Sequence, residues 1–492
     1  GFCPRLSILD VDSLEAKQPS CRKTSTLVFN GEIYNFLEIK EEFNLDVSAS
    51  SGDTEVLHAC LEKIGVEKTV KSLIGMFAFA YYDEVEELLW IARDRLGQKP
   101  LFYCSFDETF SFSSSLPLLK EVNSDEDFTV NKDILDFYFS AFYIPSPHTI
   151  YNEAVSLQQG TILKYSVEER KIIENIKYWD PKKDERNISD TEEFIRLFKN
   201  ATNIRLRSDV PIGAFLSGGI DSTYVVKQIK ENSNTNIKTF TASVKDDLDE
   251  TKYANKVANF YDLENITVDV EKSKLKISKI RELVRCFGQP FADSSILPTS
   301  LVCNLISNFV TVAISGDGSD EIFMGYEKYY AKKSFKDKMF RNNDTSFLTT
   351  KKVDKMEIVE KIIPNFNELT ELEKINQFDV RIFLEGDILQ KVDRLSMFHS
   401  LEVRSPFLDH RIVELSLKMD TKLLLEEDKG KLFLKNILEK DFDKSFVNRP
   451  KIGFMLQIEK WRSKIIDLLK PMLYICDKID IIEKDIKLEN IK

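Results

Sequence analysis

The chain has 492 residues, of which 42% are hydrophobic and 30% are charged, and its formal net charge is −12. This length exceeds what one hydrophobic core serves, so two or three domains are expected. The acidic charge argues against a nucleic-acid partner, which favours a basic face. No apolar stretch approaches the roughly 20 residues that cross a bilayer, so no membrane partner is expected. Seven cysteines and four histidines lack metal-ligand spacing, which excludes a zinc cluster and predicts free thiols in the cytoplasm.

The first third of the chain predicts short strands interrupted by two helices. Strands are expected at 5–10, 25–30, 76–82, 87–92 and 109–112, and helices at 36–43 and 54–64. This mixture is typical of a layered α+β domain. We place this domain at 1–165, a linker at 166–190 that follows a helix at 133–142, a second domain at 191–476 and a charged tail at 477–492.

Three polar clusters interrupt the predicted strands of the first domain. Asn30-Gly31-Glu32 ends a strand, Ser51-Gly52-Asp53-Thr54-Glu55 begins a helix, and residues 93–100 form a charged turn. Taken alone, each cluster fits a structural turn or a helix cap.

The second domain begins with an amphipathic helix at 191–205 and an apolar run that leads into Ser217-Gly218-Gly219-Ile220-Asp221-Ser222. A buried strand, a glycine turn and a helix start build an anion site, because N–H groups at the helix N-terminus point toward the ligand. The Gly-Lys-Ser/Thr of the common P-loop is missing. Asp221 would repel phosphates unless a cation lies between, so the motif predicts magnesium held by protein and phosphates together. The alternative is an ordinary turn with Asp221 as a first-turn acid.

Strands and helices then alternate along the second domain. Strands are expected at 237–244, 266–270 and 310–314, and helices at 250–261 and 297–308. This order predicts a parallel sheet with the ligand at the carboxyl ends of its strands.

A second chemical cluster, Ser315 to Tyr326, follows the strand at 310–314 and holds Asp317, Asp320 and Glu321. Massed carboxylates repel one another unless they hold a cation or one of them keeps a proton. Asp320 is therefore expected to share magnesium with Asp221, which leaves Asp317 as a general base. A solvated turn is the alternative.

Two further segments carry charge. Residues 391–405 suggest a salt-bridged helix that ends at Pro406, and residues 448–454 a basic turn in which Lys451 can neutralise a phosphate or a developing anion. Surface solvation is the alternative for a single lysine.

Taken together, these segments resemble the glutamine-dependent asparagine synthetase family, and the resemblance runs from Arg5 to about Trp461. It implies an incomplete N-terminal-nucleophile domain with αββα layers, followed by a PP-loop, Rossmann-like parallel-sheet domain with added helices. The segments that carry it are 5–8, 29–35, 51–55, 92–100, 217–222, 290–295, 315–326, 392–410 and 449–454.

The resemblance also implies roles for single residues. In the first domain it assigns the glutamine site to Arg5, Asn30, Gly31, Glu32 and Asp53, with Asn30 and Gly31 as the oxyanion hole. For ATP and pyrophosphate it implies Leu216, Ser217, Gly218, Gly219, Asp221, Ser222, Val244, Ser315 and Gly316. It assigns Mg²⁺ to Asp221 and Asp320, assistance of the attacking amine to Asp317 and Tyr326, and stabilisation of negative charge to Lys451.

The implied activity is that of an ATP- and Mg²⁺-dependent ligase that adenylates aspartate and transfers ammonia, released from glutamine and passed through an internal channel. A homodimer is a further expectation from the family. Three alternatives stay open: amidation of another carboxylate, tRNA modification by a PP-loop enzyme, and a non-catalytic interaction protein.

One departure concerns the glutaminase nucleophile, which in this family is an N-terminal cysteine. Cys3 does not take its place, because it follows Gly1 and Phe2 and a nucleophilic cysteine needs a base such as its own terminal amine. We expect either a fragment that lacks its first strand or a protein that lost the glutaminase activity.

Overall fold

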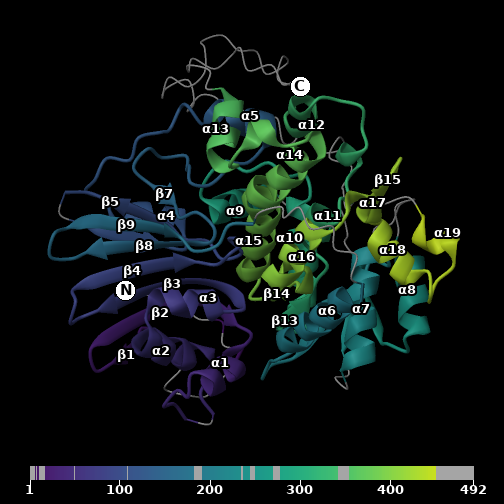
Figure 1. Ribbon diagram of the computed structural model, residues 1–492, viewed down its shortest axis with the longest axis horizontal. Coiled ribbons are helices and arrows are strands. Elements are labelled where there is room, and N and C mark those ends of the chain that lie inside the picture. Colours follow the sequence, from purple (N-terminus) through teal and green to yellow (C-terminus); the bar gives the residue numbers. More distant parts are fainter. Residues whose placement is uncertain are drawn as a thin grey trace.

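The computed structural model describes residues 6, 8, 9, 17–48, 50–107, 109–181, 191–233, 237–243, 250–269, 277–341 and 354–449. Figure 1 shows an antiparallel-sheet domain in purple and blue beside a domain of teal, green and yellow helices around a second sheet. Among the described residues, no helix is both long and apolar enough to cross a membrane.

The first domain contains two antiparallel sheets. Six strands pair in the order β1-β2-β3-β4-β8-β9, and three pair in the order β6-β5-β7. The bounds of these strands are Ser20–Arg22 (β1), Ser25–Ile33 (β2), Gly75–Asp83 (β3), Leu88–Arg93 (β4), Phe102–Ser105 (β5), Phe110–Ser113 (β6), Val155–Ser156 (β7), Thr161–Ser166 (β8) and Lys171–Lys177 (β9).

Helices cover both outer faces of these sheets. The helices are α1 (Phe36–Glu42), α2 (Asp53–Ile64), α3 (Val66–Ser72) and α4 (Leu116–Val122). Apolar side chains of α1 to α3 pack against the six-stranded sheet, and a separate core that includes Ala80, Leu101 and Leu163 fills the space between the sheets. Helix α4 contacts β5 and β6. The predicted αββα layering is confirmed.

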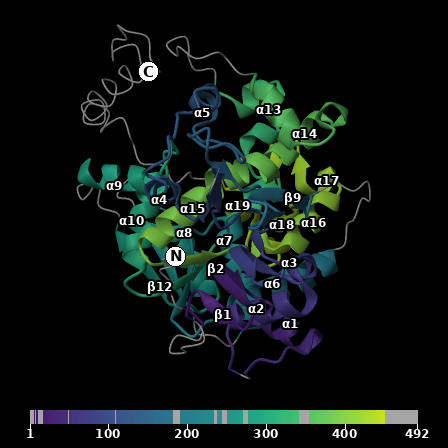
Figure 2. The same cartoon turned by 90° about the vertical axis from the view of Figure 1, so that its left-hand side faces the viewer.

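Two elements near the end of this domain connect it to the next. Strand β9 lies in the range that the sequence assigns to the linker, and it pairs with β8. Helix α5 (Leu135–Ala141) packs against the second domain, where Phe137 meets Phe340 edge to face. Figure 2 shows α5 beside the green helices at the top of the molecule.

The second domain is built on a five-stranded parallel sheet with the order β12-β11-β10-β13-β14. Its strands are β10 (Ile212–Phe215), β11 (Lys238–Ser243), β12 (Asn265–Asp269), β13 (Val312–Ile314) and β14 (Glu402–Arg404). The predicted parallel sheet is therefore confirmed. A small hairpin pairs β15 (Leu425–Glu426) with β16 (Lys429–Gly430).

Helices surround this sheet and extend the domain beyond it. Those that follow the strand–helix alternation are α6 (Thr191–Arg205), α7 (Ile220–Asn232), α8 (Thr251–Phe260), α9 (Ile277–Phe287), α10 (Ile296–Ile306) and α11 (Ser319–Ile322). The added helices are α12 (Phe335–Met339), α13 (Lys355–Ile362), α14 (Glu371–Phe378), the π-helical η4 (Asp379–Leu389), α15 (Gln390–Phe398), α16 (His410–Lys418), α17 (Thr421–Leu424), α18 (Leu432–Leu438) and α19 (Lys444–Val447).

The prediction of one helix across 391–405 is wrong in its second half. Helix α15 ends at Phe398, and Glu402 to Arg404 form β14 at the edge of the parallel sheet. Pairing of Ile314 with Arg404 adds this segment to the sheet, and the Glu402 and Arg404 side chains form an ion pair of 2.7 Å. Tertiary pairing here outweighs a charge pattern that locally suits a helix.

The strand order places a natural binding crevice between β10 and β13. The chain runs from β10 outward through β11 to β12, whereas β13 and β14 lie on the other side of β10. In open parallel sheets, ligands bind outside the carboxyl ends of the strands at such a switch point. Both chemical motifs predicted from the sequence begin where these two strands end.

Candidate active site

The loops that follow β10 and β13 approach each other closely. A Cβ atom added at Gly316 would lie 2.8 Å from the Cβ of Asp221, a separation that real Cβ atoms do not adopt. The Ser319 hydroxyl donates a hydrogen bond of 2.7 Å to Asp221 Oδ1. The two glycine-rich motifs, which lie about a hundred residues apart in sequence, therefore form one site.

The loop after β10 is shaped by its own serines and glycines. The Ser217 amide donates to Ser222 Oγ at 3.2 Å, and the Gly219 amide donates to Ser217 Oγ at 3.2 Å. Gly218 has φ +68°, and a Cβ there would lie 2.7 Å from the Ala254 nitrogen of α8. Helix α7 begins directly after this turn, without a side-chain cap. The arrangement is that of a backbone cradle for an anion at a helix N-terminus.

A lysine that the sequence analysis did not single out lies in the middle of the site. The Lys431 ammonium is 2.5 Å from Asp221 Oδ1 and 2.8 Å from Asp320 Oδ1. Burial alone would lower the pKa of Lys431, but the two carboxylates outweigh it and raise the pKa to about 12. Asp221 and Asp320 thus share one cation.

Because Asp221 and Asp320 share the Lys431 ammonium, their arrangement can be compared with what a magnesium site requires. Mg²⁺ is commonly bound through one or two carboxylates together with substrate phosphates. Asp221 and Asp320 direct one oxygen each toward a common positive charge, beside the backbone cradle. This donor set fits the ion, although the described residues contain no group of three or more metal ligands on their own.

A second pair of side chains in the site can hold a proton. The Tyr326 hydroxyl donates a hydrogen bond of 2.5 Å to Glu321 Oε1. Burial, followed by the negative charge of Asp320, raises the pKa of Glu321 to about 7. Burial also raises the pKa of Asp317 above its ordinary value, with Asp221 and Asp320 contributing. These acids are therefore poised to exchange protons nearer neutral pH than ordinary carboxylates.

The Lys391 side chain supplies a second positive charge beside Asp317. Its ammonium lies 2.5 Å from Asp293 Oδ2 and 3.9 Å from Asp387 Oδ1. Burial opposes ionisation of Asp293, but Lys391 and hydrogen bonds from Asp387 and Ser295 together outweigh it and hold the pKa of this carboxyl at about 2. The positive charge of Lys391 also acts to lower the pKa of Asp317.

The polar cluster of the first domain gathers at the end of β2. The Asp53 carboxylate accepts a hydrogen bond of 3.0 Å from the Ile33 amide, which places it beside Asn30, Gly31 and Glu32 on the same strand. A Cβ at Gly31 would lie 2.0 Å from the Met76 carbonyl oxygen, so only glycine fits there. Burial and then Asp53 raise the pKa of Glu32 well above its ordinary value.

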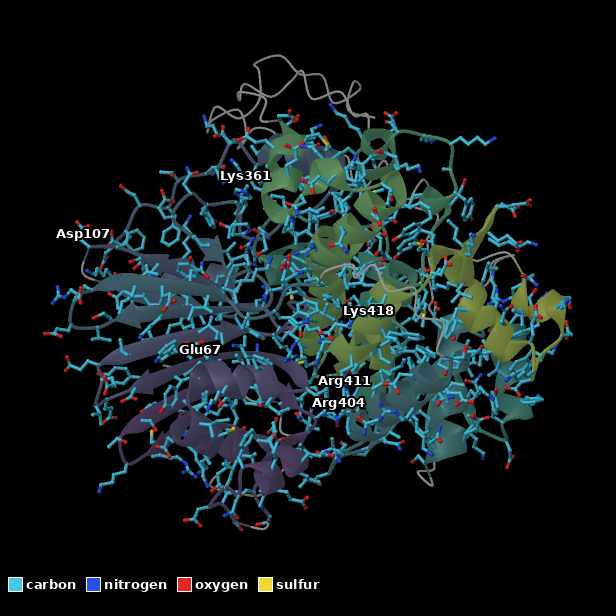
Figure 3. The ribbon with its side chains drawn as sticks, in the orientation of Figure 1. Glu67, Asp107, Lys361, Arg404, Arg411 and Lys418 are labelled. Atoms are coloured by element: carbon cyan, nitrogen blue, oxygen red, sulfur yellow. The ribbon has the colours of Figure 1, made fainter. Side chains whose placement is uncertain are left out.

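Arg404 connects this cluster with the site in the second domain. Its guanidinium lies 3.4 Å from Glu32 Oε1, while its backbone carbonyl accepts a hydrogen bond of 2.9 Å from the Ser315 amide. Figure 3 shows Arg404 and Arg411 where the purple domain meets the second domain. One residue therefore contacts both predicted sites.

The structure brings together most of the residues that the sequence predicts, within two separate clusters. The loops after β10 and β13 unite the residues at Leu216 to Ser222 with those at Ser315 to Asp320, and Tyr326 joins them through Glu321. Arg5, Val244 and Lys451 lie outside the described residues. The sequence analysis missed Lys431 and the Lys391–Asp293 pair; Asp293 stands in one of the segments that carry the resemblance, but Lys431 has no such mark.

Two family descriptions match the chain. Asparagine synthase matches residues 193–474, and the glutamine amidotransferase domain matches residues 3–179. These ranges together contain both clusters.

Three relatives that are named asparagine synthetase match different lengths of this chain. A putative glutamine-hydrolysing asparagine synthetase of Methanocaldococcus jannaschii is 38% identical over 312 residues, which cover 61% of this chain and 58% of the relative. Asparagine synthetase 1 of Bacillus subtilis is 27% identical over 520 residues, which cover 93% of this chain and 80% of the relative. Asparagine synthetase of Rattus norvegicus is 26% identical over 448 residues, which cover 87% of this chain and 71% of the relative.

Proposed function

The chain belongs to the asparagine synthase family of amide-forming carbon–nitrogen ligases, and from this premise we propose that its second domain uses ATP to convert a carboxylate into an amide. The observation that carries the proposal is the meeting of the loops after β10 and β13 around Asp221. A backbone cradle for phosphates and a set of buried acids then share one crevice.

We assign the phosphates of ATP to the turn at Ser217, Gly218, Gly219 and Ser222. Leu216, Ser315, Gly316 and Val244 would lie against the rest of the nucleotide. Asp221 and Asp320 would hold Mg²⁺, which supplies charge neutralisation for the phosphates when it is bound. In its absence, the Lys431 ammonium neutralises the same two carboxylates.

The proposed reaction has two steps. An oxygen of the acceptor carboxylate attacks the α-phosphorus of ATP, the bond to the β-phosphate bridge breaks, and pyrophosphate leaves. Ammonia then attacks the acyl carbon, and AMP leaves with the electron pair of the broken carbon–oxygen bond. The acyl-adenylate replaces a poor leaving group with a good one, which is the usual advantage of an activated intermediate.

In the second step, acidic side chains of the site are proposed to accept the proton that ammonia loses. Asp317, whose pKa is raised by burial, is the proposed base for the proton that ammonia loses. Tyr326 would orient the attacking amine while Glu321 holds its hydroxyl at 2.5 Å. Lys451, outside the described residues, is the proposed partner of the negative charge on the adenylate and the pyrophosphate.

We also propose that the first domain serves a glutamine-dependent supply of ammonia. Asn30 and Gly31 would stabilise the oxyanion on the glutamine amide, and Asp53 would bind its amino group. Free ammonium would replace this supply when the nucleophile is absent. Aspartate is the acceptor that the family suggests, and another carboxylate is the alternative.

The test combines the purified chain with ATP, Mg²⁺, aspartate and ammonium, and measures AMP, pyrophosphate and asparagine. All three products are expected in equal amounts. Pyrophosphate without asparagine would retain the chemistry and reject aspartate. No pyrophosphate with aspartate or any other acid would reject the proposed function.

A pair of variants on helix α7 tests the site. Asp221→Asn should reduce pyrophosphate release by at least 100-fold, because it removes a charged ligand of the proposed metal. Glu231→Gln is the matched control, because Glu231 lies on the same helix and pairs with Lys227 at 2.5 Å. Full activity of Asp221→Asn would contradict the proposed metal role.

A further inference from the structure

A cavity of about 700 Å³ opens next to the candidate active site. Helix α5, the loop at 292–294, the segment 328–341 and η4 enclose it; six of the residues that line it are Tyr143, Asp293, Lys328, Lys338, Arg341 and Phe383. In Figure 1 this region is at the top of the molecule, where α5, α12 and α14 lie close together.

The wall of the cavity is in contact with Tyr326. The Phe383 ring meets the Tyr326 ring edge to face, with centroids 5.9 Å apart. The Lys328 ammonium lies 4.8 Å from the centre of the Tyr326 ring and 4.3 Å from that of Phe383. Asp293, another lining residue, binds Lys391, which acts on Asp317. The cavity therefore adjoins Tyr326 and Asp317, which we assign to the attacking amine, rather than the phosphate cradle.

The segment that forms one side of the cavity is basic, although the chain as a whole is acidic. Residues 327–341 carry six lysine or arginine side chains and two acidic ones, in a chain whose net charge is −12. Lys333, Lys338 and Arg341 line the cavity, and the Arg341 guanidinium stacks 4.2 Å from the centre of the Phe142 ring. A local reversal of charge at a cavity attracts anions of opposite sign.

The acids that line the cavity do not cancel this charge. Asp293 is paired with Lys391 at 2.5 Å, whereas Asp337, which accepts a hydrogen bond from the neutral Ser334, keeps its negative charge and offsets only one of the three remaining cations. Burial and then Asp293 raise the pKa of Asp387 well above its ordinary value. Lys328 is itself paired with Asp379 at 2.5 Å, so the charge available to a ligand comes from Lys333, Lys338 and Arg341.

The volume of the cavity, like its charge, suits a large anionic ligand. Sites for drug-sized ligands have volumes of roughly 300–1,000 Å³ and enclose most of the ligand surface. An amino acid as small as aspartate would leave most of this cavity to water. A larger acid would fill it while its reacting carboxylate lies near Tyr326.

We propose that the acceptor of this enzyme is an acid larger than aspartate that carries a second anionic group, phosphate or carboxylate, which binds at Lys333, Lys338 and Arg341. This inference rests on the proposed function and names its substrate class. Lys338 and Arg341 act as specificity-determining residues, because they contact the remote part of the acceptor and not the reacting carbon.

The experiment compares aspartate, whose two carboxylates lie close together, with three larger acids that carry a more distant anionic group: 6-phosphogluconate, glucuronate 1-phosphate and the dipeptide γ-glutamyl-aspartate. Pyrophosphate release is measured with ammonium present, and binding of each acid is measured by calorimetry. At least one larger acid should show a KM tenfold below that of aspartate. Lys338→Glu and Arg341→Glu should raise that KM at least tenfold and leave the KM for aspartate within twofold.

Lys336→Glu is the matched control, because Lys336 is exposed on the same helix and does not line the cavity. It should change neither KM. The inference is overturned if aspartate alone supports turnover, none of the three acids binds, and both cavity variants leave every KM unchanged. If no acid supports turnover, yet a larger acid binds and Lys338→Glu abolishes that binding, the proposed function fails and the assignment of the cavity stands.

Discussion

The Lys431 ammonium lies 2.5 Å from Asp221 Oδ1. Asp221 belongs to the segment Ser217 to Ser222, which the sequence analysis predicts to bind phosphate and magnesium. The lysine side chain is only 7% exposed, and the aspartate side chain is 21% exposed. A cation supplied by the protein thus neutralises the carboxylates that the proposed metal would share. The consequence is that removal of Lys431 and addition of Mg²⁺ should act on the same two acids.

We expect Lys431→Ala to lower the free energy of unfolding by about 3–5 kcal/mol, because it removes the cation that two largely buried carboxylates share. Millimolar Mg²⁺ should restore part of this loss, and it should raise the melting temperature of the variant more than that of the unchanged protein. Thermal melts with Mg²⁺ and with EDTA measure both effects. Lys435→Ala, one turn further along α18, is the control and should show no added response. A Lys431→Ala variant as stable as its parent in EDTA would contradict the prediction.

Gly316→Ala tests the contact between the two loops. The added methyl group would meet Asp221 at 2.8 Å, and overpacking of this kind costs about 1–3 kcal/mol. We expect the loops to separate, with pyrophosphate release falling at least tenfold while the circular dichroism spectrum is retained.

Gly65→Ala is the control for Gly316→Ala. Gly65 has φ +80° and no atom within 4 Å of an added Cβ, so the change strains the backbone far from the site. It should lower stability and leave pyrophosphate release intact. Equal activities of the two variants would show that contact between the loops is unimportant for the reaction.

The two loops were predictable from sequence because each is a compact pattern. Glycines, serines and acids follow an apolar run within a few positions at Ser217 to Ser222, and again at Ser315 to Glu321. Their convergence was also predictable, since parallel strands present their carboxyl ends at the same edge. Short runs of apolar and aromatic residues likewise predict β2, β3 and β4, which pair with one another in the sheet.

Lys431 was not predictable, because 210 residues separate it from Asp221 and nothing in its neighbourhood marks it. It follows the β15–β16 hairpin in a left-handed conformation, with φ +58°. The prediction of a helix where the structure has strand β14 is wrong for a related reason. Glu402 and Arg404 look like surface charges until the Glu402–Arg404 and Arg404–Glu32 contacts bury them between domains.

Arg404→Met should destabilise the chain by about 3–5 kcal/mol, because it leaves Glu32 and Glu402 buried without their cation. Arg207→Ala provides the contrast. Arg207 also crosses to the first domain and pairs with Glu38 at 2.6 Å, but there the side chains are 27% and 50% exposed. An exposed pair of this kind contributes about 0–1 kcal/mol. Urea denaturation distinguishes the two variants, and equal losses would contradict the burial argument.

The four histidines of the chain predict its response to acid. Burial is the main cause that lowers the pKa of each: to about 4 for His58 and His399, to about 3 for His410, and below its ordinary value for His148. The unfolded chain therefore binds protons, at pH values below 6.5, that the folded chain excludes. The histidine contribution to stability should be complete above that pH and should fall as the pH drops toward 4.

His58→Gln measures how much His58 alone contributes to the loss of stability at acidic pH. The His58 ring lies between the hydroxyls of Ser20 and Ser25, at 2.8 and 2.9 Å. We expect the melting temperature of the variant to fall less steeply than that of the parent between pH 6.5 and pH 4. Ser20→Ala removes a hydrogen bond to the same ring without removing a proton site, so it should lower the melting temperature similarly at both pH values. Parallel curves for His58→Gln and the unchanged chain would mean that His58 is protonated in the folded protein, contrary to its burial on α2 against the first two strands.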